Sequence, residues 1–222
     1  MTTVGLIGSG HIGSTVAKLA IAAGHSAVLS NSRGPETLRD LVAELGPDAQ
    51  AATSADAAAA GDIVLISIPV KAYQDMPAQQ LAGKVVMDTG NYYPQRDGQI
   101  PELDSGSLTS SEYLTRPLPR SEVVKVFNNI FFKHLASLAR PAGVPDRSYL
   151  PIAGDSSAAK AEVTEFLDSI GYGVIDVGPL AESWRQQPGT PVYGAPYGSF
   201  DDERGTPASA DVISTALAAA VR

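Results

Sequence analysis

Three glycines near the start of the chain have the spacing of a dinucleotide-binding loop. Gly8, Gly10 and Gly13 follow an apolar stretch, residues 4–7, and open a segment with helical periodicity. In such a loop the first glycine permits a tight turn, the second lets the backbone approach a pyrophosphate, and the third lets helix and sheet pack closely. The free N–H groups and the dipole of the helix also favour a phosphate. We therefore expect a bound dinucleotide here, the alternative being a glycine-rich turn without a ligand.

The residues after the next predicted strand, 25–30, favour NADP over NAD. A carboxylate at this point accepts hydrogen bonds from the adenosine ribose of NAD, whereas an arginine accommodates the 2′-phosphate of NADP. The strand leads here into Asn31, Ser32 and Arg33, with no carboxylate before Glu36. The Arg33 guanidinium can form a charge-assisted fork on a phosphate. The sequence therefore predicts NADP(H) as the cofactor, the alternative being that Arg33 is a solvated surface side chain.

Composition and charge limit the partners that the chain can have. The 222 residues carry a formal net charge of −8 and include no cysteine. The acidic balance argues against nucleic acid or an anionic membrane as a partner, and the lack of cysteine excludes disulfides and thiol chemistry. No stretch is apolar enough to span a bilayer and we recognise no signal peptide, so we expect a cytoplasmic protein.

Strands and helices alternate along most of the chain. We predict strands over 4–7, 25–30, 49–52, 62–69, 84–87 and 122–127, and helices over 12–23, 35–45, 54–60, 72–81 and 111–115. A polar loop is expected over 92–110, a helix containing Ile130 and Leu138 after the sixth strand, and a further strand–helix–strand unit over 149–177. This order predicts a Rossmann-type, doubly wound α/β fold with a mostly parallel sheet, extended by an extra βαβ unit and a C-terminal tail.

The chain divides by composition near residue 187. We expect residues 1–186 to form a single NADP-binding domain, and residues 187–222 to form a tail rich in proline and glycine that ends in a helix. The apolar side chains of that helix, Val212, Ile213 and Leu217, have to pack on the domain or on a partner subunit. A homodimer is therefore one of the two alternatives.

Ligands of open α/β sheets bind beyond the carboxyl ends of the strands. The residues that we expect at the cofactor follow the first, second, fourth and fifth strands: Gly8, Ser9, Gly10, His11, Ile12, Gly13, Asn31, Ser32, Arg33, Ser67, Ile68, Pro69 and Gly90. His11 is expected to contribute its backbone rather than its ring. Asn91 lies at the same edge, where ordinary turn chemistry is the alternative to a role in the site. We expect His134 to be a core or surface histidine rather than a pocket residue.

The chain resembles the family of coenzyme F420-dependent NADP oxidoreductases, also known broadly as dinucleotide-binding enzymes. The resemblance covers about residues 2–182 and rests on VGLIGSGHIG at 4–13, SR at 32–33, ISIP at 66–69, VVKVFNN at 123–129, IAGD at 152–155, and Gly171 followed by DVGPL at 176–180. The first two motifs are shared by many NADP enzymes. The last three in combination are more specific to this family.

This resemblance implies hydride transfer between NADPH and a deazaflavin, coenzyme F420, whose flat ring stacks against the nicotinamide. It places Asn128 near the nicotinamide and Asn91 opposite, both as positioning residues, with residues 130–132 as apolar walls. Hydride transfer between two rings needs proximity, orientation and exclusion of water more than acid–base groups. The sequence accordingly shows no paired carboxylates and no Ser-His-Asp arrangement, and its three histidines lack metal-ligand spacing, so no metal is predicted.

The C-terminal part departs from the family pattern. An apolar helix typically follows the Gly-Pro-Leu segment, whereas this chain continues with WRQQPG at 184–189 and the tail. The hydride acceptor therefore stays open between F420 and another small molecule such as an imine, a quinone or a flavin, with Tyr193 or Tyr197 entering the site. The absence of a clear proton donor also leaves a non-catalytic NADP-sensing protein as an alternative.

Overall fold

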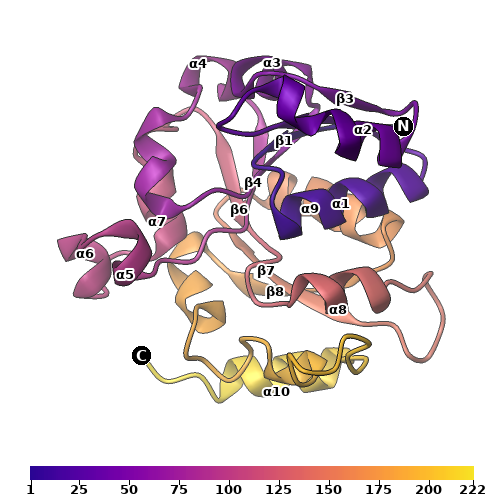
Figure 1. Cartoon of the computed structure of the whole chain (residues 1–222). Helices are drawn as coiled ribbons and strands as arrows, with labels where there is room; N and C mark the ends of the chain where they lie inside the picture. The colour runs from indigo at the N-terminus through magenta and orange to yellow at the C-terminus, as the bar shows by residue number, and fades with distance from the viewer.

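The computed structural model of the protein describes residues 1–222 and contains one eight-stranded sheet between layers of helices (Figure 1). The strands are β1 (Thr3–Ile7), β2 (Ser26–Ser30), β3 (Ala49–Ala51), β4 (Ile63–Ile66), β5 (Val85–Asp88), β6 (Glu122–Lys125), β7 (Tyr149–Gly154) and β8 (Gly173–Gly178). Their order in the sheet is β3-β2-β1-β4-β5-β6-β7-β8. All neighbours are parallel except β6 and β7, which are antiparallel. This confirms the predicted Rossmann-type fold with a mostly parallel sheet.

Helices connect most of the strands. The α-helices are α1 (His11–Ala22), α2 (Arg39–Leu45), α3 (Ser54–Ala60), α4 (Ala78–Leu81), α5 (Pro94–Asp97), α6 (Pro101–Asp104), α7 (Ser110–Thr115), α8 (Phe132–Ser137), α9 (Ser157–Ser169) and α10 (Ala210–Ala218). Four 3-10 helices complete the set: η1 (Pro35–Leu38), η2 (Val70–Asp75), η3 (Leu180–Gln186) and η4 (Ala195–Tyr197). No helix combines the length and the apolar composition that crossing a membrane requires.

The central strand β4 is apolar along its whole length because both faces of the sheet are covered. Along β4, Ile63 and Leu65 pack into one core with side chains of α1 and α9, whereas Val64 and Ile66 pack into a second core with side chains of α3 and α7. Alternate residues of a strand point to opposite faces, so one continuous apolar run supplies both cores. The two cores fix the carboxyl ends of β1, β4 and β5 at one edge of the sheet.

Several segments differ from the predicted elements, among them the helix expected over 72–81, which is replaced by η2 and the short α4. The expected loop over 92–110 contains α5 and α6, each of which has a proline in its first turn, a position that proline favours. The helix expected to include Ile130 begins only at Phe132. The sixth strand ends at Lys125 rather than at Phe127, because Phe127 turns the chain with a φ of 62°.

The C-terminal tail packs against the last two strands. Ile213 and Leu217 of α10 are buried in the same core as α1 and α9, and α10 contacts both β7 and β8. The backbone N–H of Tyr149, at the start of β7, donates to the carbonyl of Ala208 (2.9 Å). The Tyr197 hydroxyl donates to the Tyr149 carbonyl (2.8 Å). The tail is therefore bound to the strand that lies next to β6.

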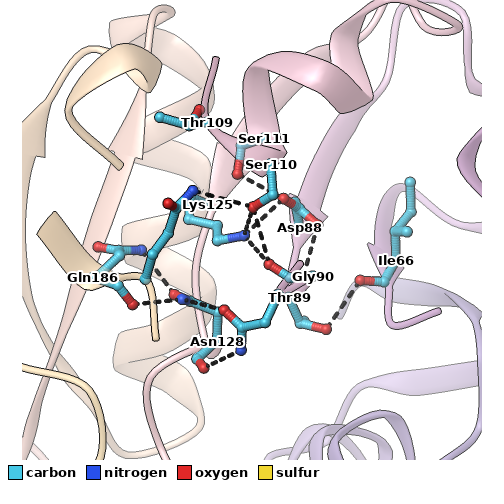
Figure 2. Close-up of polar contacts among 12 residues, drawn as sticks. Ile66, Asp88, Thr89, Gly90, Thr109, Ser110, Ser111, Lys125, Asn128 and Gln186 are labelled. Atoms are coloured by element: carbon cyan, nitrogen blue, oxygen red, sulfur yellow. Dashed lines mark hydrogen bonds and ion pairs between the residues drawn. The ribbon is translucent and has the colours of Figure 1, made fainter. Parts of the chain in front are cut away.

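A buried ion pair joins β5 to β6 (Figure 2). Asp88 and Lys125 lie side by side in the register of the two strands, with 3.1 Å between Lys125 Nζ and Asp88 Oδ2, and neither side chain is exposed to solvent. Tyr73 (2.9 Å) and Ser111 (2.6 Å) donate hydrogen bonds to the same carboxylate. Lys125 also donates to Ser110 Oγ and to the carbonyl of Gly90.

These contacts compensate for the loss of water around two charges. Burial lowers the pKa of Lys125, and the Asp88 carboxylate opposes this shift. Burial, and then the proximity of Asp88, raise the pKa of Tyr73 well above its usual value, so its hydroxyl stays a donor. The N–H of Gly90 donates to Asp88 (2.8 Å), and the Gly90 carbonyl accepts from Lys125. The pair thereby fixes the turn that begins at the end of β5.

Replacement of Lys125 by methionine is expected to destabilise the fold. Lys125→Met leaves Asp88 as an uncompensated buried charge, and removal of one member of such a pair costs about 3–5 kcal/mol. Urea unfolding at neutral pH should show this loss in the free energy of unfolding. The matched control is Asp88→Asn combined with Lys125→Met, which should be less destabilised than the sum of the two single variants. A loss below about 1 kcal/mol in Lys125→Met would contradict the assigned role.

Candidate functional site

A trough of about 590 Å³ lies at the carboxyl ends of β1, β2 and β4. It is formed by the loops that follow these three strands, which parallel pairing brings to the same edge of the sheet. Eight of the residues expected at the cofactor line it: Gly8, Ser9, Gly10, Asn31, Ser32, Arg33, Ile68 and Pro69. The structure therefore brings together residues that are up to 61 positions apart, from Gly8 to Pro69.

The glycines of the loop meet different steric demands. Gly8 has a φ of 104°, and a Cβ there would lie 2.2 Å from the carbonyl oxygen of Ser67. A Cβ on Gly13 would lie 2.0 Å from the carbonyl oxygen of Gly8. Both glycines are thus required by packing within the protein. A Cβ on Gly10 would meet nothing within 4 Å, so the space beside it is open to a ligand.

The amino end of α1 faces this open space. Gly10 is the N-cap of the helix, and no side chain caps the N–H groups of the first turn. Uncapped N–H groups at a helix start are donors for a phosphate, and the helix dipole adds to the attraction. The twelve residues of α1 give the helix three turns over which the dipole accumulates. The loop and helix together fit the pyrophosphate of a dinucleotide.

Two cationic side chains line the trough without forming an ion pair, Arg33 and Lys71. Arg33 is exposed, and its backbone N–H donates to Asn31 Oδ1 (2.9 Å), so Asn31 shapes the turn that carries the guanidinium. One carboxylate, Asp75, lines the trough as well. Sequence reasoning missed Lys71 because η2 begins at Val70, two residues before the helix expected there.

Five other residues expected at the cofactor lie outside the trough, and one of them, Ile12, lines a second cavity. Ser67 and Gly13 lie behind Gly8, where they support the loop from within. The His11 ring stacks on Phe132, with 4.2 Å between ring centroids and 12° between planes. Gly90 is buried beside Asp88 and Lys125.

A second cavity of about 370 Å³ also lies at the start of α1. Ile12 lines it, two residues after Gly10, which lines the trough. Its remaining lining comes from the ends of β5 and β6, the start of α8, and the tail. The aromatic walls are Phe127, Phe131, Phe132 and Phe200, and the polar lining residues are Thr89, Asn91, Asn128, Asn129 and Tyr193.

Asn91 and Asn128, the two residues expected to position the ligand rings, face each other in this cavity. Asn91 Nδ2 donates to the Asn128 carbonyl (2.8 Å), and Asn128 Nδ2 donates to Asn91 Oδ1 (3.0 Å). Asn128 Nδ2 also donates to the carbonyl of Gln186 (2.7 Å), and Gln186 Nε2 donates to Asn128 Oδ1 (3.1 Å). Figure 2 shows Gln186 and Asn128 next to the turn at Gly90. The amides form a fixed polar floor between β5 and β6.

The tail contributes Tyr193 and Phe200 to the cavity. The hydroxyls of Tyr193 and Tyr93 lie 2.7 Å apart. Burial, and then this hydrogen bond, raise the pKa of Tyr193, so its hydroxyl stays protonated. Tyr197 is fully buried and does not line the cavity, so of the two tyrosines considered from the sequence only Tyr193 reaches it. His134 is buried too, with its Nε2 2.6 Å from the Asp202 carbonyl.

Lys125 is buried next to this site, and the sequence analysis did not predict that it supports the site. Together with Asp88 it holds Gly90, and the next residue, Asn91, lines the cavity. A signal was present in the sequence: a lysine lies within the apolar stretch 123–127. A lysine in a buried strand is rarely found without a partner. The identity of that partner was not visible, because Asp88 lies 37 positions away.

Comparison with known proteins finds one matching family model and several similar structures. Residues 3–92 match the model of the family described as "NADP oxidoreductase coenzyme F420-dependent". A hypothetical protein from Sinorhizobium meliloti shares 32% identity and a TM-score of 0.74, over 86% of this chain and 93% of that one. A candidate F420-dependent NADP reductase from Arthrobacter sp. FB24 shares 27% identity and a TM-score of 0.68, over 82% and 87% of the two chains.

A curated relative matches as well. The metalloreductase STEAP3 of Rattus norvegicus is 30% identical over 183 residues, which are 81% of this chain and 34% of that protein. The chain thus spans about a third of the length of this relative. These matches cover the loop, the trough and most of the sheet. Residues 3–92 thus match the family of coenzyme F420-dependent NADP oxidoreductases, and most of the chain shares its fold with a candidate reductase of that kind.

Proposed function

We propose that the protein transfers hydride between NADP(H) and a flat acceptor, and that this acceptor is the deazaflavin coenzyme F420. The observation that carries the proposal is the placement of two cavities at the start of α1, where Gly10 lines one and Ile12, two residues later, lines the other. A dinucleotide held by its phosphates at Gly10 has room to extend toward Ile12. The aromatic cavity beyond Ile12 then offers space for a second ring system, and the family supplies the identity of that ring.

The residues of this chain would bind and orient the reactants. NADPH supplies the hydride when it is bound, and the acceptor takes up that hydride together with one proton from solvent. Gly10 and the start of α1 hold the pyrophosphate, and Arg33 holds the 2′-phosphate. Phenylalanine side chains exclude water from the transfer, and Asn91 and Asn128 orient the polar edges of the rings. Positioning of this kind supplies most of what the reaction needs from the protein.

The second candidate function is NADPH-dependent reduction of another small molecule, such as an imine, a quinone or a flavin. It is favoured by the rat relative, which is a metalloreductase, and by the part that Tyr193 and Phe200 of the tail play in the cavity. The trough and the role of Arg33 are the same in both candidates. A homodimer and a cytoplasmic location stay predictions from the sequence.

Loss of the Arg33 guanidinium should weaken the binding of NADPH but not the binding of NADH. A charge-assisted contact contributes about 1.5–3 kcal/mol, so Arg33→Ala is expected to raise the Kd of NADPH about ten- to a hundredfold. The Kd of NADH, which lacks the 2′-phosphate, should stay nearly unchanged. Nucleotide fluorescence titrations measure both constants. Arg39→Ala is the matched control, because Arg39 is also exposed but does not line the trough. Equal weakening of both nucleotides would disprove the assignment of Arg33 to the 2′-phosphate.

Oxidised coenzyme F420 should lose its absorbance when NADPH and the protein are added together. The expected trace is a decay that requires both protein and NADPH, because the deazaflavin ring is reduced by the transferred hydride. Stopped-flow absorbance records it. If NADPH binds and F420 is not bleached, a panel of imines, quinones and flavins tests the second candidate. Lack of NADPH oxidation by every acceptor would favour an NADP-sensing protein instead.

A further inference from the structure

One aromatic side chain of the cavity is largely exposed to solvent. Phe200 lines the cavity, yet 55% of its surface is accessible, whereas Phe127, which also lines it, is fully buried. An exposed phenyl ring gives up the hydrophobic stabilisation that burial would supply. Phe200 comes from the tail, the part of the chain that departs from the family pattern. Because the ring is exposed at the mouth of a cavity, we expect a bound ligand to cover it.

The chain around Phe200 is held in place on both sides. Before it, the Gly194 N–H donates to the Asn129 carbonyl (2.8 Å), at the cavity floor. After it, the carbonyl of Asp202 lies 2.6 Å from His134 Nε2. Ser137 Oγ donates to the Arg204 carbonyl (2.7 Å), which adds a second contact with α8. The phenyl ring is thus carried by an anchored segment rather than by a free loop.

The position of the ring is set by its neighbours. A Cβ on Gly194 would lie 2.6 Å from Phe200 Cζ, so the ring lies directly against this glycine. Phe131 meets the same ring edge to face, with 5.4 Å between centroids and 73° between planes. Phe131 in turn contacts Phe132, which stacks on His11 of the phosphate loop. A series of rings therefore runs from the dinucleotide loop to the exposed Phe200.

We propose that Phe200 is the surface on which a planar acceptor stacks at the mouth of the cavity, so that the tail sets which acceptor the enzyme takes. This inference rests on the proposed function, because it assigns the outer side of the same site. Aromatic rings offset or tilted against each other attract beyond the area they bury. An exposed ring held in a fixed position can receive a flat ligand at little cost in conformational entropy. The acceptor class that fits is an extended aromatic ring system, not a small aliphatic substrate.

The test compares the binding of two planar probes with the binding of NADPH. Coenzyme F420 and FMN are titrated into the NADP⁺-loaded protein, and their Kd is measured by fluorescence. Phe200→Ala is expected to raise the Kd of the better-binding probe about five- to tenfold. Phe200→Tyr keeps the ring and should stay within about twofold of the original protein. The matched control is Val212→Ala, which alters another exposed apolar side chain of the tail outside the cavity.

The outcomes separate this inference from the proposed function. A Kd for NADPH that stays unchanged in Phe200→Ala while the probe Kd rises supports the stacking role. Three results would overturn it: an equal rise in the Kd of NADPH and of the probe, an unchanged Kd of the probe, or no saturable binding of either probe to the original protein. NADPH oxidation by coenzyme F420 in those cases would leave the proposed function intact. If no acceptor is reduced while probe binding still depends on Phe200, the proposed function fails and the stacking surface stands.

Discussion

The site depends on how the protein stabilises the charge of one buried lysine. Lys125 lies in the middle of the sheet, out of contact with water, where an ammonium is tolerated only when several oxygen atoms surround it. Those oxygen atoms come from the end of β5, from α7 and from the turn at Gly90. Because the lysine needs all of them, the fold cannot form there without bringing these segments together. The turn that presents Asn91 is thus a by-product of neutralising a buried charge.

The two cavities differ in how far the sequence could predict them. The trough is built from short loops that follow the adjacent strands β1, β2 and β4, and the first two loops have recognisable patterns, glycines in one and polar residues beside an arginine in the other. Residue spacing and the rule for parallel strand ends were therefore sufficient to gather Gly8, Ser32 and Pro69. The succession of strands and helices follows from the same local signals, whereas the antiparallel pairing of β6 with β7 does not.

The aromatic cavity could be predicted only in part. Asn91 was expected from its strand end and Asn128 from the family resemblance, but the hydrogen bonds between Asn128 and Gln186 join residues 58 positions apart. Phe200 and Tyr193 lie in a segment without periodicity, where no pattern indicates which side chain turns inward. Such contacts depend on the tertiary packing of the tail on β7 and α8. The lysine inside an apolar strand indicated that it has a buried partner, but the sequence did not show which residue that partner is.

Phe127 shows which part of the site can vary. It is the one residue other than glycine with a positive φ, and such a conformation costs on the order of 1–3 kcal/mol. Its ring is fully buried, and loss of a buried phenyl costs about 3–5 kcal/mol, which exceeds the relief that glycine would bring. Packing thus keeps Phe127 in a strained but stable conformation. Engineering of a new acceptor range would have to leave this buried ring unchanged and exchange side chains at the solvent-facing rim, where stability and specificity are not opposed.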